Sequence, residues 1–246
     1  DVGGNYGTRN SSYPEFSLVS WAARRLRRPV KWTCDRTEAF LTDYQSRDLH
    51  AKVSLALDRA GAFLALRGTN TSNVGAHAVS FIPLTKGMAV STSVYHVPAA
   101  AIRGRAVMST MAPTTPYRAA GRPEIMFVIE RLIDIAARRH GFDRVALRSR
   151  NLVREFPYRN PAGLVYDSGD YVGAQTRVLA LADWSGFGKR RDEARSRGRR
   201  RGIGFGHYIE LNTGAPRERA EIRVLPEGRV ELVLGTMSAG QGHETS

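Results

Sequence analysis

The spacing of apolar side chains predicts one long amphipathic helix in the middle of the chain, over residues 123–140. Pro123 suits the first helical position, and Gly141 suits the left-handed residue that often follows a helix. Between them, apolar residues return every three or four positions, which places them on one face that we expect to pack on the core. That face consists of Ile125, Val128, Ile129, Leu132, Ile133 and Ala136, whereas Glu130, Asp134 and Arg138 lie on another face.

Other stretches show weaker apolar patterns, some typical of helices and some of strands. Leu18, Ala22 and Leu26 repeat at four-residue spacing and predict a helix over 13–26, which Pro29 ends. Alternation over 51–57, a turn at 58–61 and an apolar return over 63–67 predict an antiparallel hairpin. Further elements are expected as follows: strands at 30–33, 95–98, 101–108 and 202–210, a second hairpin over 219–234, helices at 143–152 and 171–182, and a polar, substrate-facing loop over 69–93.

Composition places the chain among globular proteins. It has 246 residues, of which 42% are hydrophobic and 24% charged, and it contains no apolar run long enough to span a bilayer. The single cysteine, Cys34, excludes a disulfide and a cysteine-bound zinc or iron–sulfur site within this chain. We therefore expect stability to come from a packed core.

The net charge of +14 is unevenly distributed, with basic clusters at 24–28 and 189–201. Such an excess permits binding to nucleic acid or to an anionic surface. Basic residues near the C-terminal end of a helix are also stabilised by its dipole, and no helix-turn-helix, zinc-finger or RNA-binding motif accompanies them. The pattern therefore favours ordinary solvated helix ends.

The stretch Thr114–Glu124 leads directly into the predicted central helix and brings Arg118 and Arg122 to its mouth. Free backbone amides at the start of a helix suit an anion, and Glu124 complements the positive end of the dipole. Pattern alone favours an ordinary basic loop before a core helix.

Glycine-rich loops lie at both ends of the chain. Gly3, Gly4 and Gly7 can adopt positive φ and expose amides to an anion, although glycine clusters are more often simple turns. Near the other end, Gln241 offers both a donor and an acceptor. His243 and Glu244 are adjacent and point apart, so they do not form a metal pair.

Three stretches, in order, resemble one protein family. Residues 117–124, Tyr-Arg-Ala-Ala-Gly-Arg-Pro-Glu, resemble the active-site loop of the molybdopterin-binding large subunit of the xanthine dehydrogenase and aldehyde oxidase family. Asp1–Arg9 is similar to the first glycine-rich cofactor loop of that family, and Ser238–Thr245 to its Gly-Gln-Gly-His loop. The resemblance spans the whole chain. Within the family, the chain is similar to the group that resembles the large chain of aerobic carbon monoxide dehydrogenase.

The resemblance implies an α+β fold of molybdenum cofactor-binding domains, with mixed sheets, hairpins and packed helices. We expect a first domain over 1–155, a crossing segment over 156–170 and the start of a second domain over 171–246. Because the chain begins inside one glycine loop and stops inside another, we expect it to be truncated at both ends.

The same resemblance implies site residues. Arg118 would approach the molybdenum centre, no residue would ligate the metal directly, and the glutamate base of the family would lie outside this chain. The implied cofactor-binding residues are Gly4, Tyr6, Gly7, Arg118, Gly240, Gln241, Gly242 and His243, and the implied substrate-facing residues are Asn10, Ala119 and Ala120.

The implied activity is hydroxylation of an aldehyde or N-heterocycle with oxygen from water. The cofactor would be molybdenum-molybdopterin, in bacteria often the cytosine dinucleotide form. Iron–sulfur and FAD subunits would complete a heterotrimer that dimerises, in the cytoplasm or as an exported complex. Asn10 replaces an acidic residue of purine-oxidising relatives, and Ala119 and Ala120 occupy positions near which the carbon monoxide branch has a cysteine, so both substrates are disfavoured. An inactive cofactor-binding or maturation-related protein and a basic nucleic-acid-binding protein stay open as alternatives.

Overall fold

The computed structural model describes residues 4–211, 217–236, 238–243 and 245. The chain divides into two units: a smaller one of Asp1–Asp43 with Glu210–Ser246, and a larger one of Tyr44–Ile209. Each unit combines helices with strands, which confirms the α+β class. The domain boundaries expected at 155 and 171 stay a prediction.

A three-stranded sheet forms the base of the larger unit, in the order β1 (Leu49–Leu57), β2 (Phe63–Gly75), β3 (Ala99–Met108). β1 and β2 pair antiparallel, as the predicted hairpin requires, and β3 joins β2 in parallel. The loop predicted over 69–93 is wrong, because β2 continues to Gly75 and α3 (Ile82–Ala89) follows. Asn70 and Ser72 are polar yet buried on β2, at 1% and 5% exposure, so their polarity does not mark a loop.

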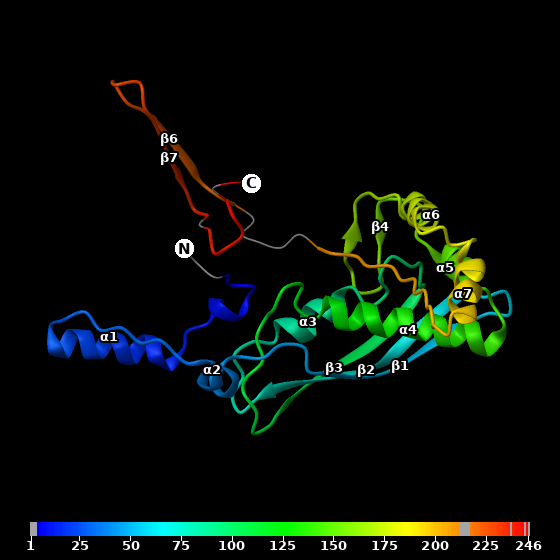
Figure 1. Ribbon diagram of the computed structural model, residues 1–246, viewed down its shortest axis with the longest axis horizontal. Coiled ribbons are helices and arrows are strands. Elements are labelled where there is room, and N and C mark those ends of the chain that lie inside the picture. Colours follow the sequence, from blue (N-terminus) through cyan, green and yellow to red (C-terminus); the bar gives the residue numbers. More distant parts are fainter. Residues whose placement is uncertain (1–3, 212–216, 237, 244, 246) are drawn as a thin grey trace. The chain divides into compact units, whose positions relative to one another are not determined.

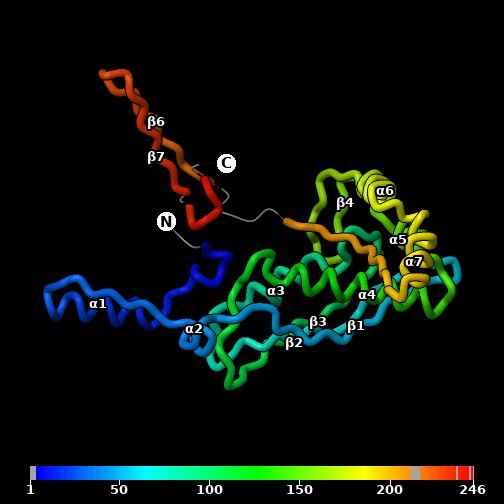
Figure 2. The backbone as a smooth tube through the Cα atoms, in the orientation of Figure 1, coloured from blue at the N-terminus to red at the C-terminus, as the bar shows by residue number. Residues whose placement is uncertain are grey.

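The central helix α4 (Arg122–His140) begins one residue before the predicted start and ends at the predicted residue, with Gly141 in the left-handed conformation after it. It continues through a short corner into α5 (Arg144–Asn151). Helices α3 and α4 cover one face of the sheet (Figures 1 and 2), where both contact its strands. A strand was expected at 95–98. In the structure this stretch forms an isolated β-bridge, between Tyr95 and Leu152. The core between these layers contains Phe63, Leu66, Val94, Tyr95, Val97, Ile129, Ile133, Ala136, Ala137, Leu147 and Leu152.

The rest of the larger unit contacts the segment after α3 and the helix α5: the Tyr166 hydroxyl donates to the Ser93 carbonyl at 2.9 Å, and Gln175 contacts Ser149. It comprises β4 (Tyr158–Arg159), β5 (Val165–Tyr166), α6 (Tyr171–Leu181) and α7 (Phe187–Ser196). Residues 202–209, which we call the strap, were expected to form a strand but pair with no strand of the described chain. Their alternating burial is genuine, because Ile203, Phe205 and His207 face inward. These side chains contact helices instead of a sheet neighbour, and this is why alternation alone gave the wrong element.

The smaller unit contains a 3-10 turn at Thr8–Asn10, α1 (Pro14–Leu26), α2 (Arg36–Thr42), β6 (Ala220–Val224) and β7 (Val230–Leu234). The predicted first helix and second hairpin are confirmed. The strand expected at 30–33 is wrong, because this stretch leads without regular structure into α2. Asp35 caps α2 by accepting the Glu38 amide at 2.7 Å, a local signal that the periodicity analysis missed. None of the helices described is long and apolar enough to cross a membrane.

Candidate cofactor site

A left-handed turn precedes α4 and carries the predicted active-site residues. Ala119, Ala120 and Gly121 have φ values of 69°, 31° and 87° in succession. The amide of Ala120 donates to the Tyr117 carbonyl at 2.8 Å, and that of Arg122 donates to the Ala119 carbonyl at 3.1 Å. Positive φ at non-glycine residues is unfavourable and persists only where the surroundings impose it. Such strain is typical of functional sites.

Gly121 is the residue that fits this turn against α3. A Cβ atom at Gly121 would lie 1.6 Å from the Pro83 carbonyl oxygen. On the facing helix, a Cβ atom at Gly87 would lie 2.6 Å from the Gly121 carbonyl oxygen. The backbones of the turn and of α3 are therefore in direct contact, and any side chain here would separate them.

Arg47 holds the same turn from the other side. Its guanidinium donates to the carbonyls of Tyr117, at 3.3 Å, and of Arg118, and it forms an ion pair with Glu124 at 3.1 Å. It also lies 5.2 Å from the centre of the Tyr117 ring. The sequence did not indicate Arg47, because this residue lies far from the loop along the chain. Glu124 was expected only to interact with the helix dipole, and its ion pair was not predicted.

The turn presents one cation to solvent and buries the other. The Arg118 side chain is exposed and forms no ion pair with any residue the structure describes. Arg122, which was predicted at the mouth of the loop, is only 6% exposed. That part of the prediction is wrong, because the first turn of α4 packs inward. Ala119 is half-buried and Ala120 buried, so small side chains surround Arg118.

The N-terminal glycine loop is also built on positive φ, at Gly4 (109°), Tyr6 (54°) and Gly7 (110°). Asn5 braces it, because its Oδ1 accepts the Gly7 amide at 2.8 Å and its Nδ2 donates to Asn10 Oδ1 at 2.7 Å. The predicted substrate residue Asn10 thus has a structural partner within the loop. The preceding motif residues, 1–3, lie outside the described part of the chain.

Polar contacts fix this loop to the end of α2. The Tyr13 hydroxyl contacts Asp43 and the Thr8 carbonyl, the latter at 3.2 Å. Arg9 forms an ion pair with Asp43 at 2.8 Å. The loop is therefore held by a few polar side chains.

The C-terminal glycine loop repeats this construction. Gly240 and Gly242 have φ values of 103° and 78°. Gln241 Oε1 accepts the Ala239 amide at 2.6 Å, and its Nε2 donates to none of the residues described. His243 is exposed, and its motif neighbour Glu244 lies outside the described residues.

Taken separately, each of these loops suits an anionic or heterocyclic group. Glycines at positive φ leave room for a bound group to approach the backbone, and exposed amides favour negative charge. Gln241 Nε2 can donate to a ring acceptor, and the Arg118 guanidinium suits an oxyanion. Within the described chain, no three His, Cys, Asp or Glu side chains gather into a metal site.

A buried ionic network lies further along α4 and was missed by sequence analysis. Arg148 has no exposed surface and forms ion pairs with Glu130, at 2.7 Å, and Asp134, at 2.9 Å. The Tyr95 hydroxyl donates to Glu130 at 2.5 Å. Burial and the Glu130 charge raise the pKa of Tyr95 far above its usual value, so it stays neutral. The polar face predicted on α4 is thus partly internal.

The strap closes over this network. Phe205 lies 5.7 Å from the Arg148 guanidinium carbon, and His207 contacts the Tyr95 ring edge-on at 5.8 Å. His207 Nε2 also lies 2.9 Å from Gln175 Oε1. Burial, and to a smaller extent the Arg148 charge, lower the pKa of His207 to about 4. His207 is therefore neutral at physiological pH.

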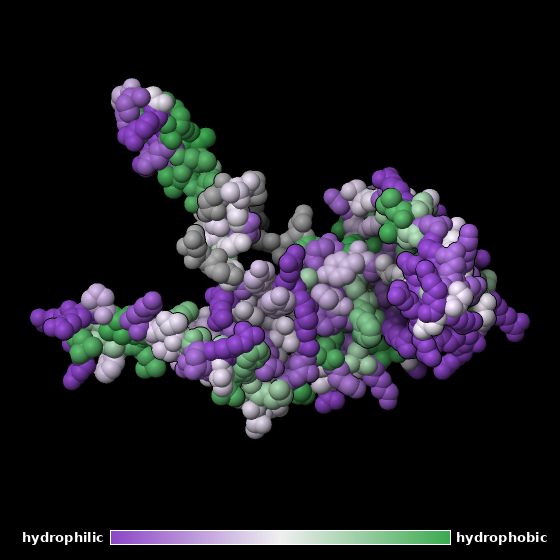
Figure 3. Space-filling model, viewed as in Figure 1, coloured by the Kyte–Doolittle hydropathy of each residue, from purple (hydrophilic) through white to green (hydrophobic). Residues whose placement is uncertain are grey.

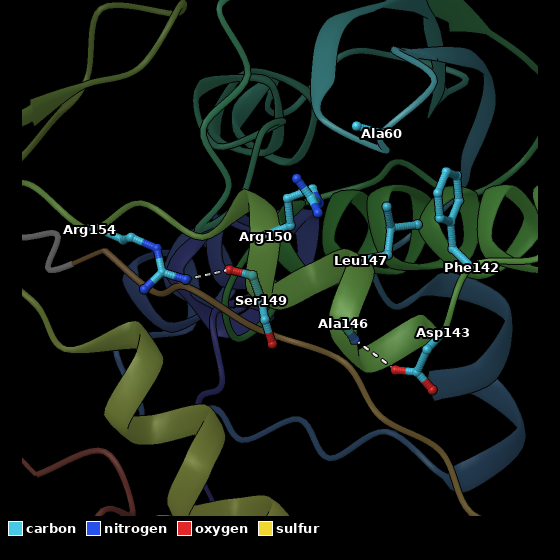
Figure 4. Close-up of a pocket in the computed structure, with 8 residues that line it drawn as sticks. All are labelled: Ala60, Phe142, Asp143, Ala146, Leu147, Ser149, Arg150 and Arg154. Carbon is cyan, nitrogen blue, oxygen red and sulfur yellow. Dashed lines mark hydrogen bonds between the residues drawn. The ribbon is translucent and has the colours of Figure 1, made fainter.

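A surface groove of about 680 Å³ beside α5 does not belong to the candidate site. Phe142 and Leu147 form its apolar side, Arg150 lies beside Leu147, and Arg154 lies at the end away from Phe142 (Figure 4). It lies at the corner between α4 and α5, whereas Arg118 precedes the other end of α4. At 1.5 Å per residue that helix is about 27 Å long.

Comparison with known proteins identifies the family. The sequence pattern of a family described as "Molybdopterin cofactor-binding domain" matches residues 1–152, and that of a second family with the same description matches residues 177–246. The first match alone covers more than half of the chain. The chain belongs to this family, within the molybdopterin-binding large subunits related to xanthine dehydrogenase.

Individual relatives agree with this assignment. The chain is 32% identical, over its whole length, to the 6-hydroxypseudooxynicotine dehydrogenase complex subunit gamma of Paenarthrobacter nicotinovorans. It is also 32% identical, over its whole length, to the carbon monoxide dehydrogenase large chain of Hydrogenophaga pseudoflava. The chain spans 32% and 33% of those two proteins. The solved structure of quinoline 2-oxidoreductase from Pseudomonas putida 86 matches with a TM-score of 0.92 and 33% identity, covering 100% of this chain and 34% of that one.

The family and its fold are therefore confirmed as the sequence predicted them. The chain corresponds to about a third of the length of the relatives it matches. The roles of individual site residues stay predictions that the geometry of the loops supports.

Proposed function

We propose that this chain forms the part of a molybdenum hydroxylase large subunit that binds the molybdopterin cofactor. The observation that carries the proposal is the strained turn at 119–121, locked by Arg47 and α3, which presents Arg118 to solvent. Strain of this kind is retained where function requires it. The family match supplies the ligand class that fits this turn.

Each loop contributes a different interaction. Arg118 would donate charge-assisted hydrogen bonds to an oxyanion and stabilise negative charge that develops during the reaction. Gln241 Nε2 and the amides beside Gly240 and Gly242 would hold the heterocycle or its phosphate tail. Gly4, Tyr6 and Gly7 would do so from the N-terminal loop, and His243 would flank the cofactor. When bound, the cofactor supplies the redox chemistry of hydroxylation with oxygen from water.

We infer that the substrate is an N-heterocycle or an aldehyde. The names of three relatives support the first class, since they specify 6-hydroxypseudooxynicotine, nicotine and quinoline. Ala119 and Ala120 would shape the pocket with small side chains, and Asn10 would face the substrate. The turn carries no thiol, the soft ligand that copper prefers, so we disfavour the copper-dependent chemistry that the name Cu,Mo-CO dehydrogenase specifies for one relative.

We further propose that the protein works in a complex with an iron–sulfur subunit and an FAD subunit, and that this heterotrimer dimerises. Support comes from the names of relatives, which include a "complex subunit gamma" and a "large chain". A single cysteine in the chain favours the cytoplasm. We expect the catalytic base outside the residues of this chain.

The test is an oxygen-tracing assay on the full-length protein, expressed with its neighbouring subunits. Heterocycles and aldehydes are offered with a dye acceptor in H₂¹⁸O. We expect ¹⁸O in the product, and we expect Arg118→Ala to lower kcat per bound molybdenum by about 10²- to 10³-fold, as for loss of one oxyanion donor. Arg67→Ala, an exposed change on β2, is the matched control and should leave kcat unchanged.

Three outcomes would contradict the proposal. Product oxygen derived from O₂ would exclude this reaction class. An unchanged kcat in Arg118→Ala would remove Arg118 from the site. Bound cofactor without turnover of any substrate would favour the inactive or maturation-related alternative.

A further inference from the structure

Positive charge on the larger unit concentrates at the end of α7. Residues 189–201 contain eight basic residues and only two acidic ones. Hydrophilic residues gather over this part of the surface (Figure 3, on the right, where Figure 1 labels α7). A concave surface of about 600 Å³ lies within this stretch, and it is lined by Arg191, Arg195, Gly198, Arg199, Arg200 and Arg201, which we call the arginine hollow.

The backbone at the end of α7 is fixed by a hydrogen-bonded cap. The Arg199 amide donates to the Ala194 carbonyl at 2.8 Å, and the Gly198 amide donates to the Arg195 carbonyl at 2.9 Å. Gly198 has a φ of 67°, so the two bonds form a Schellman motif. This turn reverses the chain and brings residues 199–201 beside the last turn of the helix.

The other end of this short segment is also held. Arg144 donates to the Ile203 carbonyl at 2.9 Å and lies 4.8 Å from the Trp184 ring. Ile203 is the second residue of the strap, which packs inward through Phe205. The backbone that carries Arg199, Arg200 and Arg201 is thus anchored on both sides. The hollow is preorganised in its backbone, although its side chains reach into solvent.

The charges in the hollow have little compensation. Arg190 shows the contrast, because it pairs with Asp183 and donates to the Ala182 carbonyl at 2.9 Å. Of the arginines that line the hollow, Arg191 forms the one ion pair to a described residue, with Asp192 at 3.4 Å. All five lining arginines are exposed. Like charges this close repel one another, and an anionic partner would remove that repulsion.

We propose that the arginine hollow docks a carboxylate-rich segment of a partner protein. The planar guanidinium binds carboxylates with two parallel hydrogen bonds, and several in one hollow suit a run of acidic side chains. The lining contains only arginine and glycine. It therefore offers no aromatic ring on which a nucleic-acid base could stack and no apolar anchor for a membrane. This proposal does not depend on cofactor binding.

The experiment measures binding of a fluorescein-labelled hexaglutamate peptide to the full chain at low and physiological salt. We expect Arg191→Ser/Arg195→Ser to weaken binding by about tenfold or more, because a hydrogen bond between charged groups contributes at least that factor. Arg199→Ser/Arg200→Ser should have a similar effect through the other side of the hollow. Circular dichroism checks that both variants fold.

The matched control is Arg24→Ser/Arg28→Ser, which removes the same charge from the basic end of α1. It should change peptide affinity less than about twofold. Equal weakening in the control and the hollow variants would overturn the proposal, because it would show a general charge effect. Tighter binding of tripolyphosphate or single-stranded DNA than of the peptide would also overturn it, in favour of a phosphate ligand.

Discussion

The two units of this chain stabilise their candidate loops in different ways. In the larger unit, a continuous apolar core lies between the sheet and α4, and the turn bearing Arg118 rests directly on α3. In the smaller unit, Tyr13, at 8% exposure, is the one buried hydrophobic side chain among the residues described. The exposed large hydrophobic side chains of the smaller unit include Phe16, Leu18, Trp21, Phe40, Leu41, Ile222, Val224 and Leu232.

This contrast indicates where each loop obtains its rigidity. The Arg118 turn is held in a strained geometry by backbone contact, an arginine clamp and a packed helix. The N-terminal glycine loop is held by polar contacts of Asn5, Tyr13 and Arg9. Perturbing the larger unit should therefore cost global stability, whereas perturbing the smaller one should loosen a loop locally.

The largest effect is expected from Arg148→Met. Removing the buried guanidinium leaves the carboxylates of Glu130 and Asp134 without their partner, which should cost about 3–5 kcal/mol in the free energy of unfolding. Urea denaturation measures it. Arg138→Met, at an exposed position of the same helix, is the control and should change stability by less than about 0.5 kcal/mol. A loss below about 1 kcal/mol in Arg148→Met would contradict a structural role for the network.

A second pair of substitutions distinguishes the cost of a positive φ at the turn from the cost of a clash with α3. Gly121→Ala should cost about 3 kcal/mol or more, because it combines unfavourable φ with a clash against Pro83. Gly141→Ala has a similar φ, of 74°, but its Cβ would meet nothing within 4 Å. It should therefore cost only about 1 kcal/mol. Equal losses by thermal unfolding would show that the contact with α3 contributes nothing.

In the smaller unit, Tyr13→Phe should act locally. Loss of the hydroxyl contacts to Asp43 and Thr8 should weaken the loop by about 1 kcal/mol, or roughly fivefold in the hydrogen exchange of amides 5–10. The urea midpoint of the larger unit should stay the same. Ser20→Ala on α1 is the control. A global loss of stability from Tyr13→Phe would contradict a local role for these contacts.

The last prediction concerns pH. His207 is held neutral in the folded chain with a pKa of about 4, whereas an unfolded histidine has a pKa of about 6.5. Between these two pKa values the unfolded state binds more protons than the folded state. The stability that neutral His207 contributes is therefore complete above about pH 6.5 and falls as the pH drops toward 4. In urea titrations, His207→Phe, which keeps a ring against Tyr95, should reduce the loss of stability between pH 7 and 5. His50→Gln at an exposed position should not, and identical pH profiles of wild type and His207→Phe would contradict the assignment.

Local signals in the sequence located the central features correctly. The bounds of α4 follow from Pro123, Gly141 and the apolar periodicity between them, and the turn before it follows from a contiguous motif. Arg47 and Arg148 escaped prediction, because their partners are brought to them by tertiary packing and no local pattern marks a buried arginine. The strand predicted for the strap was wrong for a related reason. Alternation indicates which side chains are buried, but it does not indicate which elements cover them.

The central claim is that this chain carries molybdopterin-binding loops, and metal and pterin content test it most directly. Full-length protein is purified with its partner subunits from its native host, beside Arg118→Ala, Gln241→Ala and the control Arg67→Ala. The account predicts about one molybdenum and one pterin per chain in the wild type and control, and less in the two loop variants. A folded, assembled wild-type sample without molybdenum would contradict it.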